Sequence, residues 1–170
     1  MSDDALSGRA KKVVQQMTDA VGEHLSAGES IELAVRVNLK GTVTATAAGA
    51  LGGATGAVAA ANALSPGVEE AAAAGFPTDT QQALGLTSSA LVVASRSGFS
   101  GKPKTYRCSV PLSAIASVVH EPGRLGDQLT LTMADGSSTT FECVKVDPGA
   151  EFAEAVTRRL GSGRAPDATS

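Results

Sequence analysis

A cluster of basic side chains around one aromatic ring is the part of this sequence best suited to contact a partner. Residues 96–107 contain four basic residues, no acid and one phenylalanine. At an anionic bilayer each cation contributes about 1 kcal/mol, and an aromatic ring can enter the headgroup region. A protein with an acidic face suits the same residues, and the alternative is an ordinary solvated hairpin tip. The candidate contact residues are Arg96, Phe99, Lys102, Lys104 and Arg107.

A run of small residues is the second candidate surface. Residues 41–68 contain no charged side chain and consist mostly of alanine, glycine and threonine. Gly49 and Gly53, and again Gly52 and Gly56, stand four residues apart, a spacing that lets two helices approach closely. This spacing predicts self-association, and the alternative is a low-complexity insert without a partner.

The same run is long and uncharged, which raises the question of a membrane span. Only four residues between positions 41 and 64 are leucine, isoleucine, valine or phenylalanine, the types that drive insertion. We therefore expect a tightly packed helical hairpin or a mobile loop.

Catalytic and metal-binding residues follow no recognisable pattern. Catalysis needs a nucleophile with a base, or paired carboxylates, gathered in one pocket. His24 is expected on the polar side of a helix and His120 at a strand end. Cys108 and Cys143 lack the CxxC spacing of metal and dithiol sites, which predicts reduced core thiols, with a disulfide only if two strands bring them face to face. We expect no enzyme, no cofactor and no metal.

Composition limits the location and the partners. A chain of 170 residues suits one domain, and an aromatic content of 3% predicts an aliphatic core. The net charge of −3 argues against nucleic acid as a partner. The first residues are acidic and lack an apolar stretch, which predicts a cytoplasmic location, with peripheral membrane association as the alternative.

The elements that position these residues begin with a helix and a strand. Residues 5–25 carry apolar side chains at helical spacing, which predicts an amphipathic helix within an N-terminal region of residues 1–28. Residues 30–39 alternate apolar and polar types, which predicts a strand with one buried face. The side chains expected on that face are Ile31, Leu33, Val35, Val37 and Leu39.

From residue 84 on, the pattern predicts antiparallel strands. A hairpin is expected with arms over residues 86–97 and 105–110, and Tyr106, Cys108 and Val110 are expected on one face of the second arm. The remaining strands are predicted over residues 115–120, 128–133 and 139–146.

Turn and capping residues define the end of the chain. Asp135-Gly136 predicts a two-residue hairpin turn. Asp147-Pro148-Gly149 begins a helix that carries Phe152, Val156 and Leu160 on one stripe. Residues 161–170 are expected to form a disordered tail.

Several of these segments together suggest a known architecture. Leu84-Gly85-Leu86-Thr87 opens one strand, Pro111 to Ile115 enters the next, and Leu129 to Gly136 leads to the terminal helix with Phe152. The span from Leu84 to Leu160 resembles the bacterial pleckstrin-homology-like and GRAM-like domains, especially short actinobacterial members of unknown role. This resemblance implies an α+β fold, an antiparallel barrel or sheet closed by a C-terminal helix.

On this basis the domain is expected over residues 29–160, interrupted by an insert over residues 41–83. Some pleckstrin-homology domains bind phosphoinositides through basic residues between their first strands, whereas this connection here is the uncharged insert, so that lipid site is not carried over.

The sequence as a whole predicts a non-catalytic binding or interaction module that self-associates through the insert into a homo-oligomer or binds a protein partner. The alternative is a peripheral membrane or lipid-binding protein that contacts an anionic surface through the tip at residues 96–107.

Overall fold

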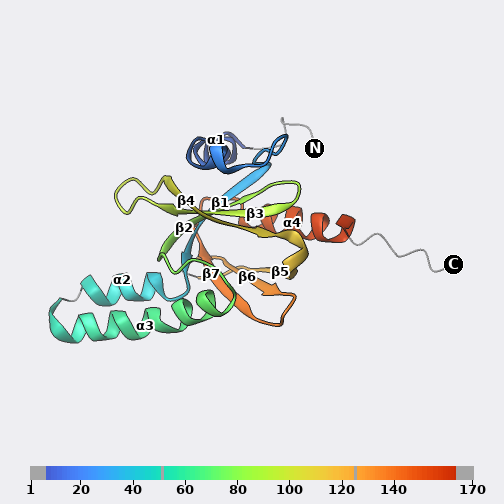
Figure 1. The fold of residues 1–170 in the computed structure, drawn as a ribbon. Coiled ribbons are helices and arrows are strands. Elements are labelled where there is room, and N and C mark those ends of the chain that lie inside the picture. Colours follow the sequence, from blue (N-terminus) through green and yellow to red (C-terminus); the bar gives the residue numbers. More distant parts are fainter. Residues whose placement is uncertain (1–6, 51, 125, 164–170) are drawn as a thin grey trace.

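The computed structural model describes residues 7–50, 52–124 and 126–163. Within these residues, four helices and seven strands form one α+β unit (Figure 1). The helices are α1 Gly8–Val21, α2 Thr42–Ala50, α3 Gly53–Ala73 and α4 Gly149–Gly163, with short 3-10 turns at η2 Gly22–His24 and η3 Leu112–Ala114. The strands are β1 Leu33–Leu39, β2 Gln81–Leu86, β3 Ala90–Arg96, β4 Pro103–Pro111, β5 Ile115–Glu121, β6 Gln128–Met133 and β7 Ser138–Cys143.

The strands form one antiparallel sheet in the order β4-β3-β2-β1-β7-β6-β5. Within each half, β1 to β4 and β5 to β7, strands that are consecutive in the sequence pair with each other. Strand β1 joins the two halves by pairing with β2 on one side and β7 on the other. In Figure 1 the half containing β5 to β7 lies below the half containing β1 to β4, so that their inner faces enclose one core. The predicted antiparallel sheet with a C-terminal helix is confirmed.

The inner face of β1 carries the alternating side chains that the sequence predicts. Leu33, Val35, Val37 and Leu39 are buried in the main core together with residues of every other strand. Helix α4 closes this core with the fully buried Phe152 and Val156. Because burying one such side chain stabilises the fold by about 1.5–3 kcal/mol, these two side chains hold α4 against the sheet.

A second apolar layer covers the outer face of β1 to β4. Helix α1 packs there through Val13, Met17 and Val21, over small side chains such as Ala34 and Ala94. Gly85 belongs to the same layer, since a Cβ at that position would lie 3.2 Å from Met17 Cγ. The expectation of one buried face for residues 30–39 is therefore incomplete, because Ala34 on the opposite face is also buried. Ile31, predicted on the inner face, packs in this outer layer with Met17 instead.

Several strand boundaries differ from the prediction, since β1 begins at Leu33 and β4 covers Pro103–Pro111. The first arm of the expected hairpin, residues 86–97, is divided, because β2 ends at Leu86 and β3 begins at Ala90. The Thr87 hydroxyl makes the turn by accepting the backbone N–H groups of Ser89 and Ala90. Strand β2 begins at Gln81, within the region assigned to the insert, and β7 ends at Cys143 instead of residue 146.

The expected alternation along β4 is wrong at Tyr106. The register with β3 shifts between Val93 and Ala94, which pair with Cys108 and Tyr106 respectively. This bulge turns Tyr106 to the outer layer beneath α1, while Cys108 packs against the main core.

The helices also differ from their expected ranges. Helix α1 begins at Gly8 with the Ser7 side chain as its N-cap, and α4 continues through Gly163. The rest of the expected tail, residues 164–170, lies outside the described residues. The insert forms the helical hairpin α2–α3, and no described helix is long and apolar enough to cross a bilayer.

The burial of Phe152 gives a test of the terminal helix. Phe152→Ala leaves a cavity beneath α4, and we expect a loss of about 3–5 kcal/mol in the free energy of unfolding. Chemical denaturation followed by circular dichroism measures this change. Glu154→Ala, on the exposed face of the same helix, is the control and should change stability by less than about 0.5 kcal/mol. A loss below about 1 kcal/mol for Phe152→Ala would contradict the packing described here.

Candidate functional site

The tip of the β3–β4 hairpin carries part of the predicted contact surface. Phe99 is fully exposed in the turn between Arg96 and Pro103. Lys102 and Lys104 are also exposed, and within the part of the chain that the structure describes neither ammonium group forms a hydrogen bond or an ion pair. We call Phe99, Lys102 and Lys104 the tip.

The other two predicted contact residues are engaged within the chain. Arg96 donates to the carbonyl oxygen of Val37 at 3.2 Å, to Asn38 Oδ1 at 2.5 Å and to the carbonyl oxygen of Gly101 at 3.3 Å. Arg107 forms an ion pair with Asp79 at 2.9 Å. The cations free to attract an anionic surface at this end are therefore the two lysines of the tip.

Arg96 belongs to a buried charge cluster that supports the tip from behind. The carboxylate of Asp147 is completely buried and accepts three hydrogen bonds from Arg36, one from the backbone N–H and two from the guanidinium, at 2.7–2.9 Å. Burial and the neighbouring Arg36 cation lower the pKa of Arg96 to about 10, and Asp147 opposes this shift in part. Arg36 and Arg96 thus both lie near the buried carboxylate of Asp147, and Arg96 also holds the turn through the carbonyl oxygen of Gly101.

The base of the α2–α3 hairpin is anchored by close backbone contacts. A Cβ at Gly41 would lie 1.9 Å from the carbonyl oxygen of Ala63, and one at Gly67 would lie 2.3 Å from that of Lys40. The Glu142 carboxylate accepts the N–H groups of Gly41 and Val43 and so caps α2 from strand β7. The glycines that permit close approach are therefore Gly41 and Gly67, which the sequence analysis did not select.

The glycines that were selected for self-association lie at the far end of the hairpin. Gly52 and Gly53 have φ angles of 71° and 74° and form the turn between α2 and α3. Gly56 is buried in α3, and a Cβ at Gly49 would meet no other atom within 4 Å. Gly49 belongs to α2 and Gly53 to α3, while Gly52 precedes the helix that contains Gly56, so the four glycines do not form one helix face.

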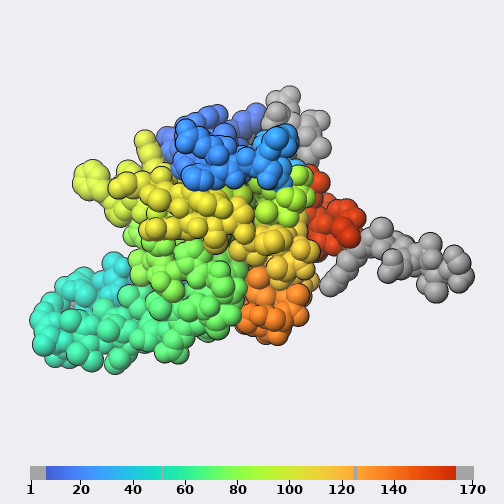
Figure 2. Space-filling model, viewed as in Figure 1, coloured from blue at the N-terminus to red at the C-terminus, as the bar shows by residue number. Residues whose placement is uncertain are grey.

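Beyond its base, the hairpin projects from the barrel. Figure 2 shows it as a separate lobe, and α2 and α3 lie beside each other in it. We call the uncharged residues 42–50 and 52–64 of this lobe the arm. Most arm side chains are exposed, including Val58, which is 60% exposed.

The histidines and cysteines form no common site. The His24 ring stacks on Tyr106 with centroids 4.2 Å apart, and His120 Nε2 lies 2.9 Å from Asp127 Oδ2. Both thiols are free, and strands β3, β2 and β1 separate Cys108 on β4 from Cys143 on β7. Burial raises the pKa of Cys143 to about 12, with Asp127 and Asp147 acting in the same direction. The described ranges contain no group of three side chains arranged to hold a metal ion.

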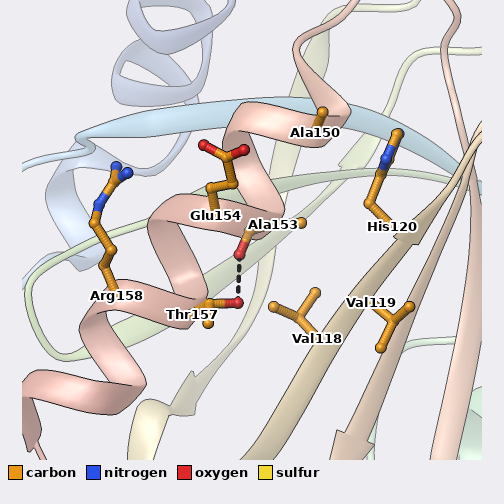
Figure 3. Close-up of a pocket in the computed structure, with 8 residues that line it drawn as sticks. All are labelled: Val118, Val119, His120, Ala150, Ala153, Glu154, Thr157 and Arg158. Carbon is orange, nitrogen blue, oxygen red and sulfur yellow. Dashed lines mark hydrogen bonds between the residues drawn. The ribbon is translucent and has the colours of Figure 1, made fainter.

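A groove between β5 and α4 was missed by the sequence analysis. It has a volume of about 580 Å³. In Figure 3 Val118 and Thr157 face each other across it, and the Thr157 hydroxyl donates to the carbonyl oxygen of Ala153 at 2.8 Å. The complete lining is Val118, Val119, His120, Ala150, Ala153, Glu154, Thr157 and Arg158. These residue types carry no motif, so only the packing of the two elements reveals the groove.

Comparisons with known proteins identify the fold. No protein-family model and no curated protein matches the chain. A solved pleckstrin homology domain from Shewanella amazonensis SB2B is 14% identical, with 93% of this chain and 96% of that one covered and a TM-score of 0.51. A DUF1696 family protein with a pleckstrin-homology domain from Shewanella loihica PV-4 is 13% identical, with coverages of 86% and 92% and a TM-score of 0.47. The chain has a pleckstrin-homology-like fold.

The buried charge cluster behind the tip gives a second test. Asp147→Asn removes the carboxylate shared by Arg36 and Arg96 and leaves two adjacent cations without a counter-charge. We expect a loss of about 3 kcal/mol in the free energy of unfolding, at the low end for a broken buried pair because Arg36 is partly exposed. The control is Glu32→Gln, which breaks the exposed pair with Arg159 and should cost less than about 1 kcal/mol. Equal effects of the two substitutions, measured by denaturant unfolding, would show that the cluster is not a stabilising element.

Proposed function

We propose that this chain is a non-catalytic interaction module that associates with copies of itself through the arm. The observation that carries this proposal is the absence of charge over a projecting surface, since residues 41–68 contain no acidic or basic side chain. Helices with solvent on their outer faces ordinarily place charged and polar residues there, whereas a helix that is apolar on all sides is ordinarily covered. A surface of this kind favours a partner that covers it.

The small size of the arm side chains favours another arm as that partner. Alanine and glycine let helix backbones approach closely, so two such surfaces pack together with good complementarity. Most soluble oligomers are symmetric assemblies of identical chains, and a surface that pairs with itself gives a closed dimer. Val58, which is 60% exposed, would then lose its contact with water.

The anchored base of the hairpin makes the arm a defined structure for such pairing. The Glu142 cap and the contacts at Gly41 and Gly67 hold the base on the barrel. An arm held in this way loses little conformational freedom when it associates, which favours binding.

A charge placed in the arm should dissociate the assembly. Ala59→Lys puts an ammonium group on an exposed arm position, and we expect the mass to fall to that of the monomer because burying an unpaired cation is costly. Ala72→Lys, at an exposed position near the base of the same helix, is the matched control and should leave the mass unchanged. Analytical ultracentrifugation at matched concentrations decides the question. A wild-type chain that is monomeric throughout the micromolar range would end the proposal.

A second candidate function is peripheral contact with an anionic membrane through the tip. The specific observation is the full exposure of Phe99 beside two lysines that have no ion pair within the described residues. The β1–β2 and β3–β4 connections lie at the same end of an antiparallel meander, and in Figure 1 the arm and the tip project to the same side. An uncharged arm and an aromatic tip with lysines could meet one bilayer surface together.

Vesicle sedimentation tests this second function. Binding to vesicles that contain phosphatidylserine should weaken with added salt and fall when Phe99, Lys102 and Lys104 are changed to serine together, because two cations supply about 2 kcal/mol at an anionic surface. Lys11→Ser with Lys12→Ser, on the exposed face of α1, is the control for a general loss of positive charge. Equal binding to vesicles of neutral phosphatidylcholine would contradict the electrostatic contribution, and absence of binding to either would exclude the membrane function.

A further inference from the structure

One guanidinium connects the turn that carries the tip to the strand that leads into the arm. Arg96, the last residue of β3, reaches across β2 to β1, where its Nη2 donates to the carbonyl oxygen of Val37 at 3.2 Å and to Asn38 Oδ1 at 2.5 Å. Its Nη1 donates at 3.3 Å to the carbonyl oxygen of Gly101. Gly101 belongs to residues 97–102, which we call the tip turn. Arg96 therefore contacts both the end of β1 and the tip turn.

This position is unfavourable for a cation. Burial and the neighbouring Arg36 disfavour the charged form and lower the pKa of Arg96 to about 10. In addition, Arg96 Nε is buried and has no hydrogen-bond partner within the described residues. A buried charge with an unsatisfied donor ordinarily lowers stability, and such groups are retained in some proteins because they fix one conformation. The unfavourable surroundings therefore point to a positioning role for Arg96.

The tip turn depends on this contact for its orientation. The Ser97 N–H donates to the carbonyl oxygen of Lys102 at 2.9 Å, and the Gly101 N–H donates to that of Ser97 at 2.8 Å. These bonds and those to the Ser97 and Ser100 hydroxyls join one residue of the turn to another. Within the described residues, the Arg96 side chain therefore supplies the hydrogen bond that ties the tip turn to β1.

The β1 end of this connection leads directly into the arm. Asn38 is paired with Glu142 of β7, and the Glu142 carboxylate accepts the N–H groups of Gly41 and Val43 at the start of α2. The arm and the tip turn project to the same side of the molecule (Figure 1). A continuous series of contacts therefore runs from the tip turn through Arg96 and Asn38 to the base of the arm.

We propose that Arg96 and Asn38 are positioning residues that hold the tip turn in a fixed orientation beside the arm, so that an anionic bilayer meets a surface formed in advance. A preformed turn loses little conformational freedom when its aromatic ring enters the headgroup region, which favours binding. The proposal rests on the second function proposed above for the identity of the partner. The fixed orientation itself is measured on the chain in solution, without a membrane.

Asn38→Ala removes one end of the connection without changing any charge. We expect the amides of Ser97 and Gly101 to exchange with deuterium about tenfold faster or more, because hydrogen bonds to charged groups are among the stronger ones in proteins. Gln81→Ala is the matched control, since Gln81 is the cross-strand neighbour of Asn38 and its side chain forms no hydrogen bond within the described residues. Hydrogen exchange of the full chain followed by NMR resolves the two amides. Equal exchange in the two variants overturns the positioning role.

Two substitutions of Arg96 separate positioning from charge and from general stability. Arg96→Lys keeps the charge but loses the forked donor, and we expect it to accelerate exchange in the tip turn as Asn38→Ala does. Arg96→Met removes the buried charge and should leave the midpoint of chemical denaturation unchanged or raise it, while the tip turn still exchanges faster. A lower midpoint with faster exchange throughout β3 and β4 means that Arg96 stabilises the sheet in general, and this result overturns the positioning role.

Vesicle sedimentation then relates the orientation of the tip turn to binding. On vesicles that contain phosphatidylserine, Asn38→Ala should bind about threefold more weakly than the wild type and Gln81→Ala, because a loosened turn must be ordered on binding. Neither substitution changes the net charge, so the difference is not electrostatic. Equal binding by the two variants overturns the proposal. A wild-type chain that binds no vesicle ends the membrane function instead, and the exchange measurements then decide the positioning role by themselves.

Discussion

The rest of the structure depends on the burial of β1 on both faces. Its inward side chains Leu33, Val35 and Val37 hold the main core, while Ala34 on the outward face is small enough for α1 to lie against the sheet. The strand also joins the two halves of the sheet. Arg36 also lies on the outward face of β1, and the buried carboxylate of Asp147 balances its charge. One strand thus fixes the core, the outer helix and the charge cluster behind the tip.

The arm follows directly from this arrangement, because it leaves the sheet at the end of β1. The chain turns at Gly41, whose φ of 88° and contact with Ala63 no other residue type could satisfy. Glu142 on the neighbouring strand β7 caps α2 at the same point. Below the arm, Phe76 packs edge-on against Phe141, which continues the core under the hairpin. A lobe of small side chains thereby gains a firm base without a core of its own.

Local sequence patterns predict those elements whose side chains alternate regularly between buried and exposed positions. The alternation over residues 33–39 and the Phe152 stripe are confirmed, whereas Ile31 lies in the outer layer with α1. The chain turns at Asp135-Gly136, but the predicted two-residue turn is wrong: the Gly136 N–H donates to the carbonyl oxygen of Met133, and Gly136, with a φ of 90°, follows the central residues Ala134 and Asp135. Strands β2 and β3 are buried on both faces, and the polar run Thr87-Ser88-Ser89 between them is the signal of the turn that the sequence analysis included in one strand. The bulge at Tyr106 and the inward turn of Arg96 depend on partners in other strands, Ala94 and Val37, which no local pattern reveals. The β5–α4 groove escapes prediction for the same reason.

The candidate surfaces differ in the physical property that a partner would use. The arm offers close approach without charge, the tip offers an aromatic ring with two lysines, and the groove between β5 and α4 offers small and apolar side chains. The tip lies at the start of β4, whereas β5 follows the other end of that strand, so the tip and the groove belong to different parts of the surface. Copies joined through their arms would carry more than one tip, and an anionic surface that meets one tip would meet the second at a high effective concentration. A weak contact at each tip would then be sufficient for firm binding, so an uncharged arm and a basic tip are compatible features of one small module.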